Sequence, residues 1–544
     1  MEAGSVLHPE VVDFSVTLSL IVTLLGLLYW YSVYPFSVLS RCGIKHPKTV
    51  PFYGNFFMFR EGFYQPVIKL IKTHGRVCGY YLGRKPVVVI ADPDMLRQVL
   101  VRDFSSFPNR QSLRFRTKPM IDCLLMLKNE HWKRVRSILT PSFSAVKMKE
   151  MVPLINAAAE TLMNNLKGYA DSGEAFDIHR CFGCFAIDVI ASVAFAAQVD
   201  SQNNPDEPLV QKTQMFFSLS AFRPIFFLFV ALPSIMTPLV KFFPDRRLDQ
   251  MNEFFKNSIQ RIIRQREQQP PEKRRRDFLQ LMLEAQTRNE CVSLEHFDTT
   301  DHSDLEQRRA PWDQQSGQPR SRELPARRSH KTMTEEEIVG QAFIFLLAGS
   351  ETNTSALTFT CYLLALHPEC QSRVQEEVDQ FFTRHSSPDY SNVQELKYLD
   401  MVVSEALRLY PPFFRFARAI DRDCVVNGQL LPKGATLEIP VGFLHQDPEH
   451  WPEPERFIPE RFSPEAKAAR HPFVYLPFGA GPRNCVGMRL AQLEIRMALV
   501  HLLHEFSVVA CSETQVPLEI KLSSVLEPKN GIFVKIEKRN MAEE

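Results

Sequence analysis

The sequence has no excess of charge of either sign. Its 544 residues contain 64 Lys and Arg against 62 Asp and Glu, a formal net charge of +2. The basic residues are scattered and are not interleaved with aromatic residues, which argues against nucleic acid as a partner. The 11 cysteines are odd in number and irregularly spaced, which favours reduced thiols facing the cytosol over a disulfide framework.

Charged residues are absent from one long stretch near the N-terminus, from Phe14 to Tyr34. About 20 such apolar residues can cross a bilayer as a helix. Acidic residues alone precede the stretch, whereas Arg41, Lys45 and Lys48 follow it, so the bulk of the chain is expected on the cytosolic side. A cleaved signal peptide is the alternative, but the run is too long and no A-x-A-like site follows. We expect residues 1–45 to form an uncleaved membrane anchor.

The rest of the chain, residues 46–544, predicts one mainly helical domain with a small β region. The segment CGYYLGRKPVVVIADPDML, from Cys78, alternates like paired strands and ends in a helix start. Helical patterns then continue to about Arg408, and Arg415 to Pro440 returns to short strands with a hairpin turn at Asn427. A polar, charged stretch at about 287–333 predicts a mobile surface connection within the domain.

The stretch PFGAGPRNCVG carries a single cysteine ahead of a helical pattern. It contains F-x-x-G-x-R-x-C-x-G, with Phe478, Gly481, Arg483, Cys485 and Gly487 at the fixed positions. The glycines permit a tight turn, and the following helix N-terminus would stabilise a thiolate. Phe478 can shield the sulfur, and Arg483 suits an acidic group. A structural buried cysteine is the alternative interpretation.

These five positions resemble the haem-binding loop of the cytochrome P-450 superfamily. The resemblance implies haem b as cofactor, with the thiolate of Cys485 as the axial iron ligand. It also implies that the Trp132 and Arg136 of HWKRVR, together with Arg418, contact the haem propionates beside Arg483. Asn109 and Arg110 could meet a propionate or a substrate carboxylate, or lie in a solvated loop.

Two further stretches fit the same family. EALR places Glu405 and Arg408 one helical turn apart, and PERF supplies Arg461. A solvated salt bridge between Glu405 and Arg408 is the alternative for EALR alone. In the family, the three residues form a buried network that holds the core around the haem loop. This role is structural rather than catalytic.

TEEEIVGQAFIFLLAGSETNTSALTFTCYLLALHP predicts a long helix that begins after Thr334 and is interrupted at Ala348–Gly349. Glu351 and Thr352 follow the interruption. Oxygen-activating members of the family carry an acid–alcohol pair here that delivers protons. The alternative is a threonine that bonds back to its own helix carbonyls.

Within the superfamily, segments such as SGEAFDI, YLPFGAGPR and DPEHWP resemble the branch that isomerises prostaglandin H2 to thromboxane A2. The resemblance implies a reaction that needs no external reductant and also forms hydroxy-heptadecatrienoic acid and malondialdehyde. That branch carries an aliphatic residue where this sequence has Thr352, which favours the alternative of an NADPH-dependent, 3-type monooxygenase of lipophilic substrates. A haem protein without turnover is a third hypothesis.

The resemblance also sets expectations for location and partners. We expect a single-pass protein of the endoplasmic reticulum membrane with a cytosolic catalytic domain. The expected substrate is small and lipophilic, prostaglandin H2 under the first hypothesis. Cytochrome P-450 reductase would be a partner only of a monooxygenase, and the chain is expected to be a monomer.

Overall fold

The computed structural model describes most of the chain: residues 9–60, 62–111, 117–217, 228, 230–239, 245–270, 272, 274, 277–287, 291–293, 328–330, 332–522 and 525–539. The predicted polar connection at about 287–333 lies almost wholly outside these residues and stays a prediction.

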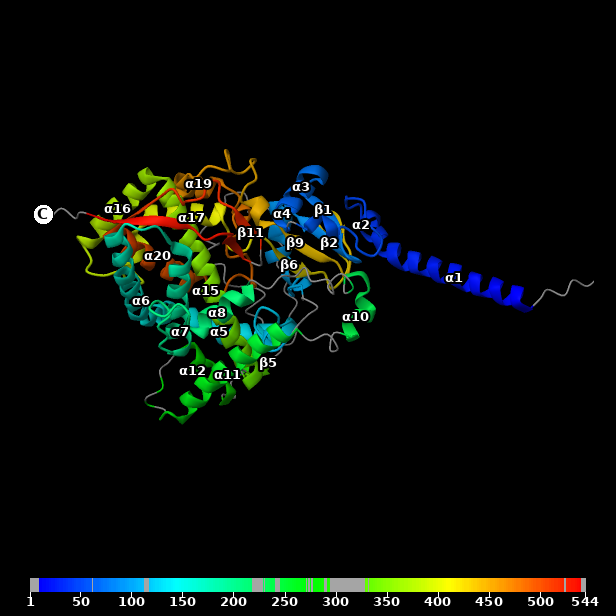
Figure 1. Ribbon diagram of the computed structural model, residues 1–544, viewed down its shortest axis with the longest axis horizontal. Coiled ribbons are helices and arrows are strands. Elements are labelled where there is room, and N and C mark those ends of the chain that lie inside the picture. The colour runs from blue at the N-terminus through cyan, green and yellow to red at the C-terminus, as the bar shows by residue number, and fades with distance from the viewer. Residues whose placement is uncertain are drawn as a thin grey trace, which may run out of the picture.

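Helices form most of the described structure. Figure 1 shows the larger ones gathered on the side of the molecule away from the N-terminal helix. Their bounds are α3 Tyr64–His74, α4 Pro93–Arg97, α5 Asn129–Leu139, α6 Ala145–Ser172, α7 Ile178–Phe195, α8 Pro208–Phe217, α10 Pro233–Leu239, α11 Arg246–Gln268, α12 Phe278–Thr287, α15 Glu335–Leu366, α16 Pro368–Phe382, α17 Lys397–Leu409, α18 Val441–Leu444, α19 Pro464–Ala469 and α20 Met488–Glu505.

The strands form small sheets. The four-stranded sheet has the order β1 (Val77–Leu82), β2 (Lys85–Ile90), β9 (Thr436–Ile439), β6 (Phe416–Ala419), and only β2 and β9 run parallel. This sheet lies on the side of the molecule nearer the N-terminal helix (Figure 1). The remaining strands are β3 Phe176–Asp177, β4 Cys291–Ser293, β5 Arg328–His330, β7 Cys424–Val426, β8 Gln429–Leu431, β10 Phe506–Val509, β11 Ile520–Leu522, β12 Leu526–Pro528 and β13 Phe533–Lys538.

The predicted mainly α fold with a small β region is confirmed, and so are several of its local signals. The paired strands after Cys78 are β1 and β2, and Asp92 caps α4 by accepting from the Met95 amide. Asn427 and Gly428 both adopt positive φ, 45° and 80°, between β7 and β8, as a tight hairpin turn requires.

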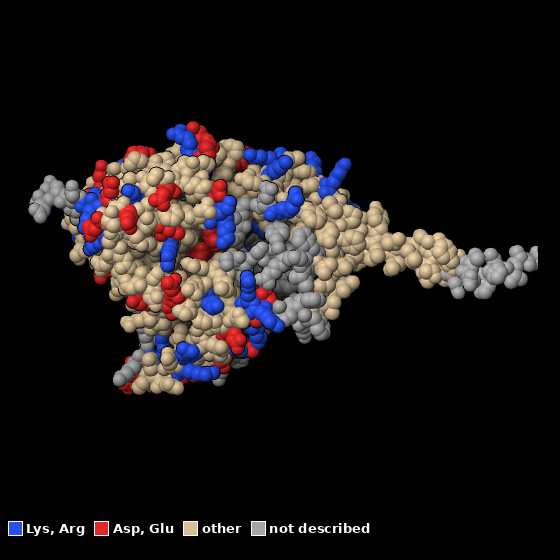
Figure 2. Space-filling view, viewed as in Figure 1, with Lys and Arg blue, Asp and Glu red and all other residues tan. Residues whose placement is uncertain are grey.

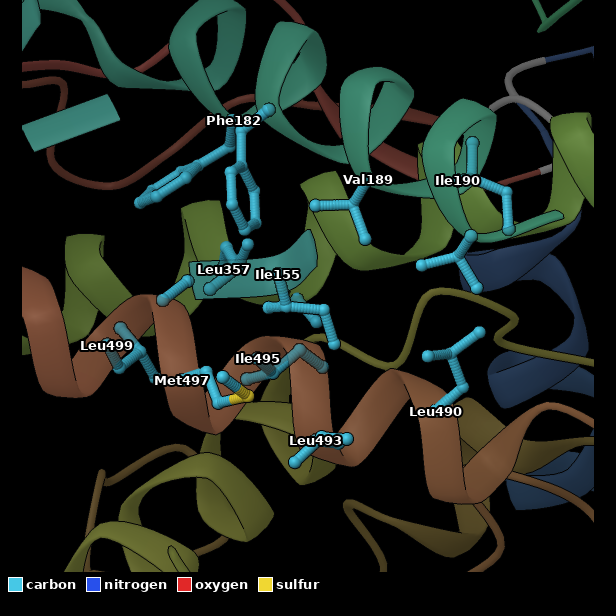
Figure 3. Close-up of a cluster of buried hydrophobic side chains, with 14 of the residues drawn as sticks. Ile155, Phe182, Val189, Ile190, Leu357, Leu490, Leu493, Ile495, Met497 and Leu499 are labelled. Atoms are coloured by element: carbon cyan, nitrogen blue, oxygen red, sulfur yellow. The ribbon is translucent and has the colours of Figure 1, made fainter. Parts of the chain in front are cut away.

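Helix α15 is the centre of the helical core. It is buried on nearly every side and packs against α7, α11, α12, α17 and α20. Figure 3 shows side chains of α7 such as Phe182, Val189 and Ile190 meeting those of α15 and α20. A side chain at Gly349 would come within 2.8 Å of Ile190, so the glycine permits this close packing.

The structure corrects one prediction about α15. No interruption occurs at Ala348–Gly349, since the helix runs unbroken from Glu335 to Leu366. Both small residues keep helical geometry: Gly349 allows the close contact with Ile190, and Ala348 is exposed on another side of the helix. The predicted helix start is confirmed: Thr334 and Glu337 form a capping box, each side chain bonded to the other's backbone amide.

The N-terminal helix α1, Pro9–Val33, projects away from the body of the protein (Figure 1). The apolar side chains from Phe14 to Tyr34 are mostly exposed, and Figure 2 shows no charged atoms along this part. Exposed apolar surface of this length fits a membrane anchor. The chain then turns through Tyr34–Ser37 and α2, Val38–Arg41, into the sheet region.

The segment after α1 packs into the folded body. Phe36, Leu39 and Ile44 are buried in the hydrophobic cluster around β1 and β2, and the Leu39 amide donates to the Tyr81 hydroxyl at 2.9 Å. These side chains contribute to the stability of the sheet region, although they lie within the predicted anchor of residues 1–45.

Two truncations should therefore differ in stability. A chain beginning at Tyr34 should unfold at nearly the same temperature as the full chain. A chain beginning at His46 should be several kcal/mol less stable, because burial contributes roughly 1.5–3 kcal/mol for each large apolar side chain. Thermal and urea unfolding in the same detergent would measure the difference. Equal stability of the two truncated chains would contradict it.

Candidate active site

The cysteine loop is a tight turn that leads directly into α20. The Cys485 amide donates to the Phe478 carbonyl at 2.9 Å, and the Asn484 amide donates to the Gly481 carbonyl at 2.9 Å. Gly481 has a φ of +71°, and a Cβ there would lie 1.9 Å from the Leu100 carbonyl oxygen. Only glycine fits this close approach, as the motif predicts.

The Cys485 thiol lies in a mixed electrostatic environment. Burial raises the pKa of the Cys485 thiol, whereas the Gly487 amide and the charges of Arg136 and Arg110 act to lower it. The amide belongs to the start of α20, so a helix N-terminus does face the sulfur. A metal cation at the sulfur would offset the cost of burying a thiolate.

Cys485 borders an internal space. A water molecule can reach the Cys485 side chain, although protein surrounds the residue. On α15, Ala348 is exposed and Ile344 and Thr352, one turn to either side, are half-buried, whereas most of this helix is buried. Side chains spaced four apart share one helix face, so this face of α15 also borders space inside the protein.

Four arginines surround the cysteine loop. Arg483 donates to the carbonyls of Pro108 at 2.7 Å and Leu127 at 2.8 Å, and its guanidinium lies 4.2 Å above the Trp132 ring. Arg136 donates twice to Asn484, to its carbonyl at 3.1 Å and to its side-chain oxygen at 2.8 Å.

The other two arginines complete the group. Arg110 donates to the Arg483 carbonyl at 3.2 Å, and Arg418 on β6 is fully buried. The structure thus brings Trp132, Arg136, Arg418 and Arg483 to the cysteine loop, as their predicted shared role requires.

Arg110, Arg136, Arg418 and Arg483 form an arginine cluster that concentrates positive charge beside the cysteine loop, and Arg418 and Arg483 are buried. Burial and the three neighbouring arginines lower the pKa of Arg483, and burial and Arg110 lower the pKa of Arg418. Because a guanidinium stays protonated in proteins, these shifts report an unfavourable environment for a cation.

The arginine cluster also has unused donors. In the described chain, Arg418 Nε and Arg483 Nη1 are buried without a hydrogen-bond partner. A ligand with two carboxylates, placed between this cluster and the space at Cys485, would satisfy both the charge and the donors. The haem propionates and iron fit this donor set.

Glu351 and Thr352 point to different sides of α15. The Thr352 hydroxyl donates to the Ala348 carbonyl at 2.6 Å, which is the helix-bonded alternative considered from the sequence. Glu351 instead faces α7, where its carboxylate lies 4.0 Å from His179 Nε2. Burial, and less strongly Glu527, raise the pKa of Glu351 to about 8, so its carboxyl is protonated at neutral pH. The structure does not bring the acid and the alcohol together.

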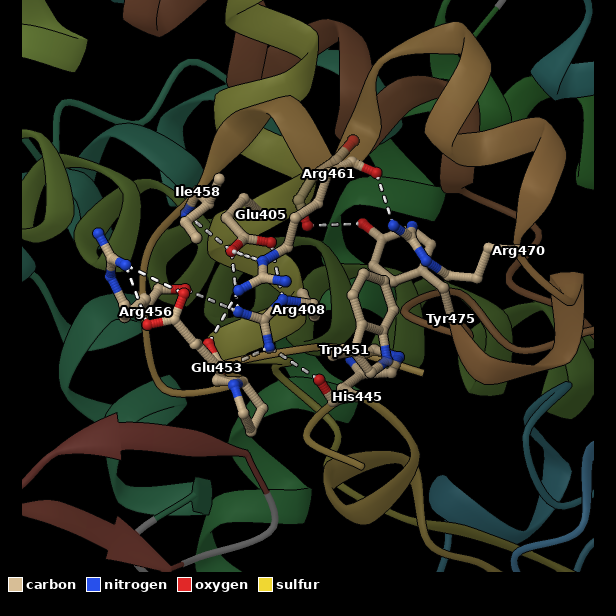
Figure 4. Close-up of polar contacts among 12 residues, drawn as sticks. Glu405, Arg408, His445, Trp451, Glu453, Arg456, Ile458, Arg461, Arg470 and Tyr475 are labelled. Carbon is tan, nitrogen blue, oxygen red and sulfur yellow. Dashed lines mark hydrogen bonds and ion pairs between the residues drawn. The ribbon is translucent and has the colours of Figure 1, made fainter. Parts of the chain in front are cut away.

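Glu405, Arg408 and Arg461 meet in a buried network (Figure 4). Arg408 donates to both carboxylate oxygens of Glu405, at 2.7 and 2.8 Å, and Arg461 Nε lies 3.3 Å from the same carboxylate. Arg408 also donates to the carbonyls of His445, Pro454 and Arg456. The network ties α17 to the loop segments that precede the cysteine loop.

Sequence reasoning missed one residue of the site and left another open. Asn484, which holds Arg136, sits inside the motif at a position the pattern leaves free, so only its place between Arg483 and Cys485 could have indicated it. Arg110 had two alternatives, and the structure places it against the loop rather than in solvent.

A thiol at a helix N-terminus that faces an internal space, beside arginines of which two have an unpartnered buried donor, fits a haem-thiolate site. A cytochrome P450 family profile matches residues 44–306 and 304–536 of the chain. The chain belongs to the cytochrome P450 family, and the protein is an enzyme whose haem iron is held by a cysteine thiolate.

Two groups of relatives match nearly the whole chain. Thromboxane-A synthase of Mus musculus is 48% identical over 540 residues, 99% of this chain and 100% of that protein. Thromboxane-A synthase of Sus scrofa is 47% identical over 98% of this chain and 99% of that protein. Cytochrome P450 3A12 of Canis lupus familiaris is 37% identical over 95% of each chain.

Replacing Arg483 should weaken haem retention. Arg483→Leu removes the unpartnered Nη1 donor and a charge from the arginine cluster, and a hydrogen bond to a charged group contributes about 1.5–3 kcal/mol, so haem should dissociate roughly tenfold faster or more. Arg483→Lys keeps the charge and should lose less. Transfer of haem to an excess of an apo-globin, followed by absorbance, gives the rates.

The matched control is Arg456→Leu, since the Arg456 side chain is exposed and pairs with Glu453 at the surface. Its haem should dissociate at the wild-type rate. Equal rates for Arg483→Leu and Arg456→Leu would show that Arg483 does not hold the cofactor.

Proposed function

We propose that this protein is a membrane-anchored haem-thiolate isomerase that converts prostaglandin H2 to thromboxane A2. It would also form hydroxy-heptadecatrienoic acid and malondialdehyde, without external reductant. One observation carries the proposal: the identity to thromboxane-A synthases is 47–48% over nearly the whole chain, against 36–37% to the 3A-type relatives.

Each site residue has a proposed role. Cys485 is the axial iron ligand, and Arg483, Arg418, Arg136 and Trp132 hold the propionate edge. Their support is the shared position around the internal space and the unpartnered donors of the arginine cluster.

The surrounding residues position the loop. Gly481 allows it to approach the Leu100 carbonyl, and Phe478 packs against the helical core beside it. The network of Glu405, Arg408 and Arg461 holds the segments before the loop and has no chemical role, which the complete burial of Glu405 and Arg408 supports.

The proposed isomerisation requires little proton transfer by residues of the chain. Bound haem supplies an iron that can accept an endoperoxide oxygen while the O–O bond of the substrate breaks. The small side chain of Ala348, which is exposed, leaves room beside α15 for the substrate. Thr352 keeps its hydroxyl on the Ala348 carbonyl, so the proton of that hydroxyl is already engaged. The apolar face at Ile344 and Ala348 would keep water from the substrate.

The proposal extends to the setting of the enzyme. Residues 1–45 form the anchor and residues 46–544 the catalytic domain, with a polar connection at about 287–333. We place the protein in the endoplasmic reticulum membrane, with a single span and a cytosolic catalytic domain, and as a monomer. The exposed apolar helix α1 followed by Arg41, Lys45 and Lys48 supports this orientation.

A second candidate function is NADPH-dependent monooxygenation of lipophilic compounds with cytochrome P-450 reductase as partner. It is favoured by the presence of both Glu351 and Thr352. The engaged hydroxyl of Thr352 and the separation of the two side chains weigh against it in this conformation.

Replacement of the proposed ligand tests the site. Cys485→Ala should abolish the Soret band that thiolate ligation gives to the reduced carbon monoxide complex, because the alanine cannot coordinate iron. Cys424→Ala, at a half-buried cysteine in β7, is the control and should keep the band. A retained band in Cys485→Ala would overturn the assignment of the ligand.

An assay of purified, haem-loaded protein with prostaglandin H2, without NADPH or reductase, tests the function. Thromboxane B2, the hydrolysis product of thromboxane A2, should appear together with malondialdehyde. Thr352→Val should keep this activity within about threefold. The Thr352 hydroxyl bonds only a carbonyl of its own helix, so its removal should change the free energy of the protein by less than ~1 kcal/mol.

The opposite result has an equally definite meaning. No product from prostaglandin H2, but oxygenated products from lipophilic compounds once reductase and NADPH are added, would establish the monooxygenase. In that case Thr352→Val should lose the oxygenated products.

A further inference from the structure

A cavity lies between α6, α7 and α12, apart from the space at Cys485. Its volume of about 330 Å³ is at the lower end of the range for small-molecule sites. The turn Thr140–Phe143, the start of α6, the end of α7 and residues 277–284 supply its lining. Among the described residues that line it, none belongs to the arginine cluster, the cysteine loop or the face of α15 at Ala348. The cavity is therefore separate from the haem-thiolate site.

One part of the lining is apolar. Met151 on α6, Val193 on α7 and Phe278 on α12 are buried in the helical core, and Leu281 packs against the same core. These four side chains form a wall against which the apolar body of a ligand can be buried.

Two buried side chains of the lining have a polar atom without a partner. Ser142 is 4% exposed and Gln280 is 7% exposed. Within the described part of the chain, neither the Ser142 hydroxyl nor Gln280 Oε1 has a hydrogen-bond partner. Gln280 Nε2 donates to Glu284 Oε1 at 3.3 Å, so the unpartnered atom of the amide is its oxygen, which can only accept. Such atoms cost free energy, and a ligand with a hydrogen-bond donor would remove that cost.

The charges of the lining disfavour an anionic ligand. Lys147, the basic residue of the lining, forms an ion pair with Glu150. The Asp277 carboxylate accepts from Arg266 at 3.0 and 2.7 Å. The lining thus contains three acidic groups, the third being Glu284, against one basic group. In contrast to the arginine cluster, this cavity fits a neutral ligand.

Phe143 connects the wall of the cavity to the cysteine loop. Its ring centroid lies 4.7 Å from that of Phe278, which lines the cavity. A Cβ at Gly487 would lie 3.6 Å from the Phe143 ring, and Gly487 is the N-cap of α20. A ligand against Phe278 would therefore be linked by one further ring to the start of the helix that follows Cys485.

We propose that this cavity is a second small-molecule site, which binds a compact, neutral lipophilic alcohol. The ligand hydroxyl would donate to Gln280 Oε1, and the Ser142 hydroxyl would bond to the same polar end of the ligand. Both atoms are shielded in this conformation. The staggered rotamers of serine and the broad terminal torsion of glutamine allow them to turn toward the ligand. The site goes beyond the proposed isomerisation and does not depend on it.

Photolabelling with p-(hydroxymethyl)benzophenone, a compact photoreactive alcohol, tests the site. The full-length, haem-loaded protein is irradiated with this compound while a triaryl imidazole that ligates the iron fills the haem-side space. Mass spectrometry should find saturable labelling of peptides that contain Met151, Val193 or Leu281. The matched compound p-ethylbenzophenone has a methyl group in place of the hydroxyl. Its half-saturating concentration should be about fivefold higher, because it loses one hydrogen bond.

Two variants should remove the difference between the two compounds. Gln280→Leu lacks the acceptor, so the half-saturating concentration of the alcohol should rise about fivefold while that of the ethyl compound stays unchanged. Ser142→Ala should weaken binding of the alcohol in the same direction, and it should fold as wild type because it removes an unpartnered hydroxyl. Thermal unfolding midpoints check that both variants are folded.

The matched control is Gln286→Leu, at an exposed glutamine on the same helix α12. It should leave labelling by both compounds unchanged, since Gln286 does not line the cavity.

Two results would overturn the proposal. One is the lack of saturable labelling of these peptides, which would mean that the cavity holds only water. The other is equal half-saturation by the alcohol and the ethyl compound in wild type, which would mean that the site does not recognise a hydroxyl. Neither result depends on whether prostaglandin H2 is the substrate.

Discussion

The repulsion among buried guanidinium groups around one thiol is the constraint on which the active-site region depends. Arg110, Arg136, Arg418 and Arg483 come from segments far apart in the sequence, and isolated cations are costly in a protein interior. They are kept in place by backbone carbonyls such as those of Pro108 and Leu127, which bind Arg483. These bonds, with those from Arg136 to Asn484, hold a loop and helix α5 against the cysteine loop. The remaining positive charge makes an anionic ligand part of the stable structure.

Arg408, in the network at Glu405, is also a buried cation, but protein groups rather than a ligand satisfy its donors. Arg408 has both carboxylate oxygens of Glu405 and three carbonyls as partners, so its donors are satisfied inside the protein. Removal of one partner from such a buried pair is strongly destabilising, whereas the intact pair is nearly neutral in free energy. The two groups of arginines therefore divide their roles. Arg408, with its donors satisfied by the protein, supports the fold, whereas the unpartnered donors of Arg418 and Arg483 are available to a ligand.

Local signals in the sequence predicted turns and helix starts. Features that depend on contacts between distant residues could not be predicted from the sequence. The capping box at Thr334 and the hairpin at Asn427 depend on neighbouring residues, which the sequence displays, whereas the glycine turn before Cys485 was predicted from its motif and its contact with Leu100 was not. The continuity of α15 was predicted wrongly, because Gly349 serves contact with Ile190 on α7 rather than a break in the helix. The partners of Glu351 were invisible for the same reason, since His179 lies 172 positions away in the chain.

Glu351 and Thr352, the acid and the alcohol of the motif, lie in two different environments on α15. Successive residues of a helix point about 100° apart, so Thr352 borders the internal space while Glu351 faces α7. A substrate that carries its own peroxide bond needs only the first environment, and it benefits when protons and water stay in the second. The presence of both residues therefore does not by itself distinguish an isomerase from a monooxygenase. The distinction depends on whether the Thr352 hydroxyl leaves the Ala348 carbonyl, because only a freed hydroxyl could carry protons from the Glu351 side to the space beside Cys485.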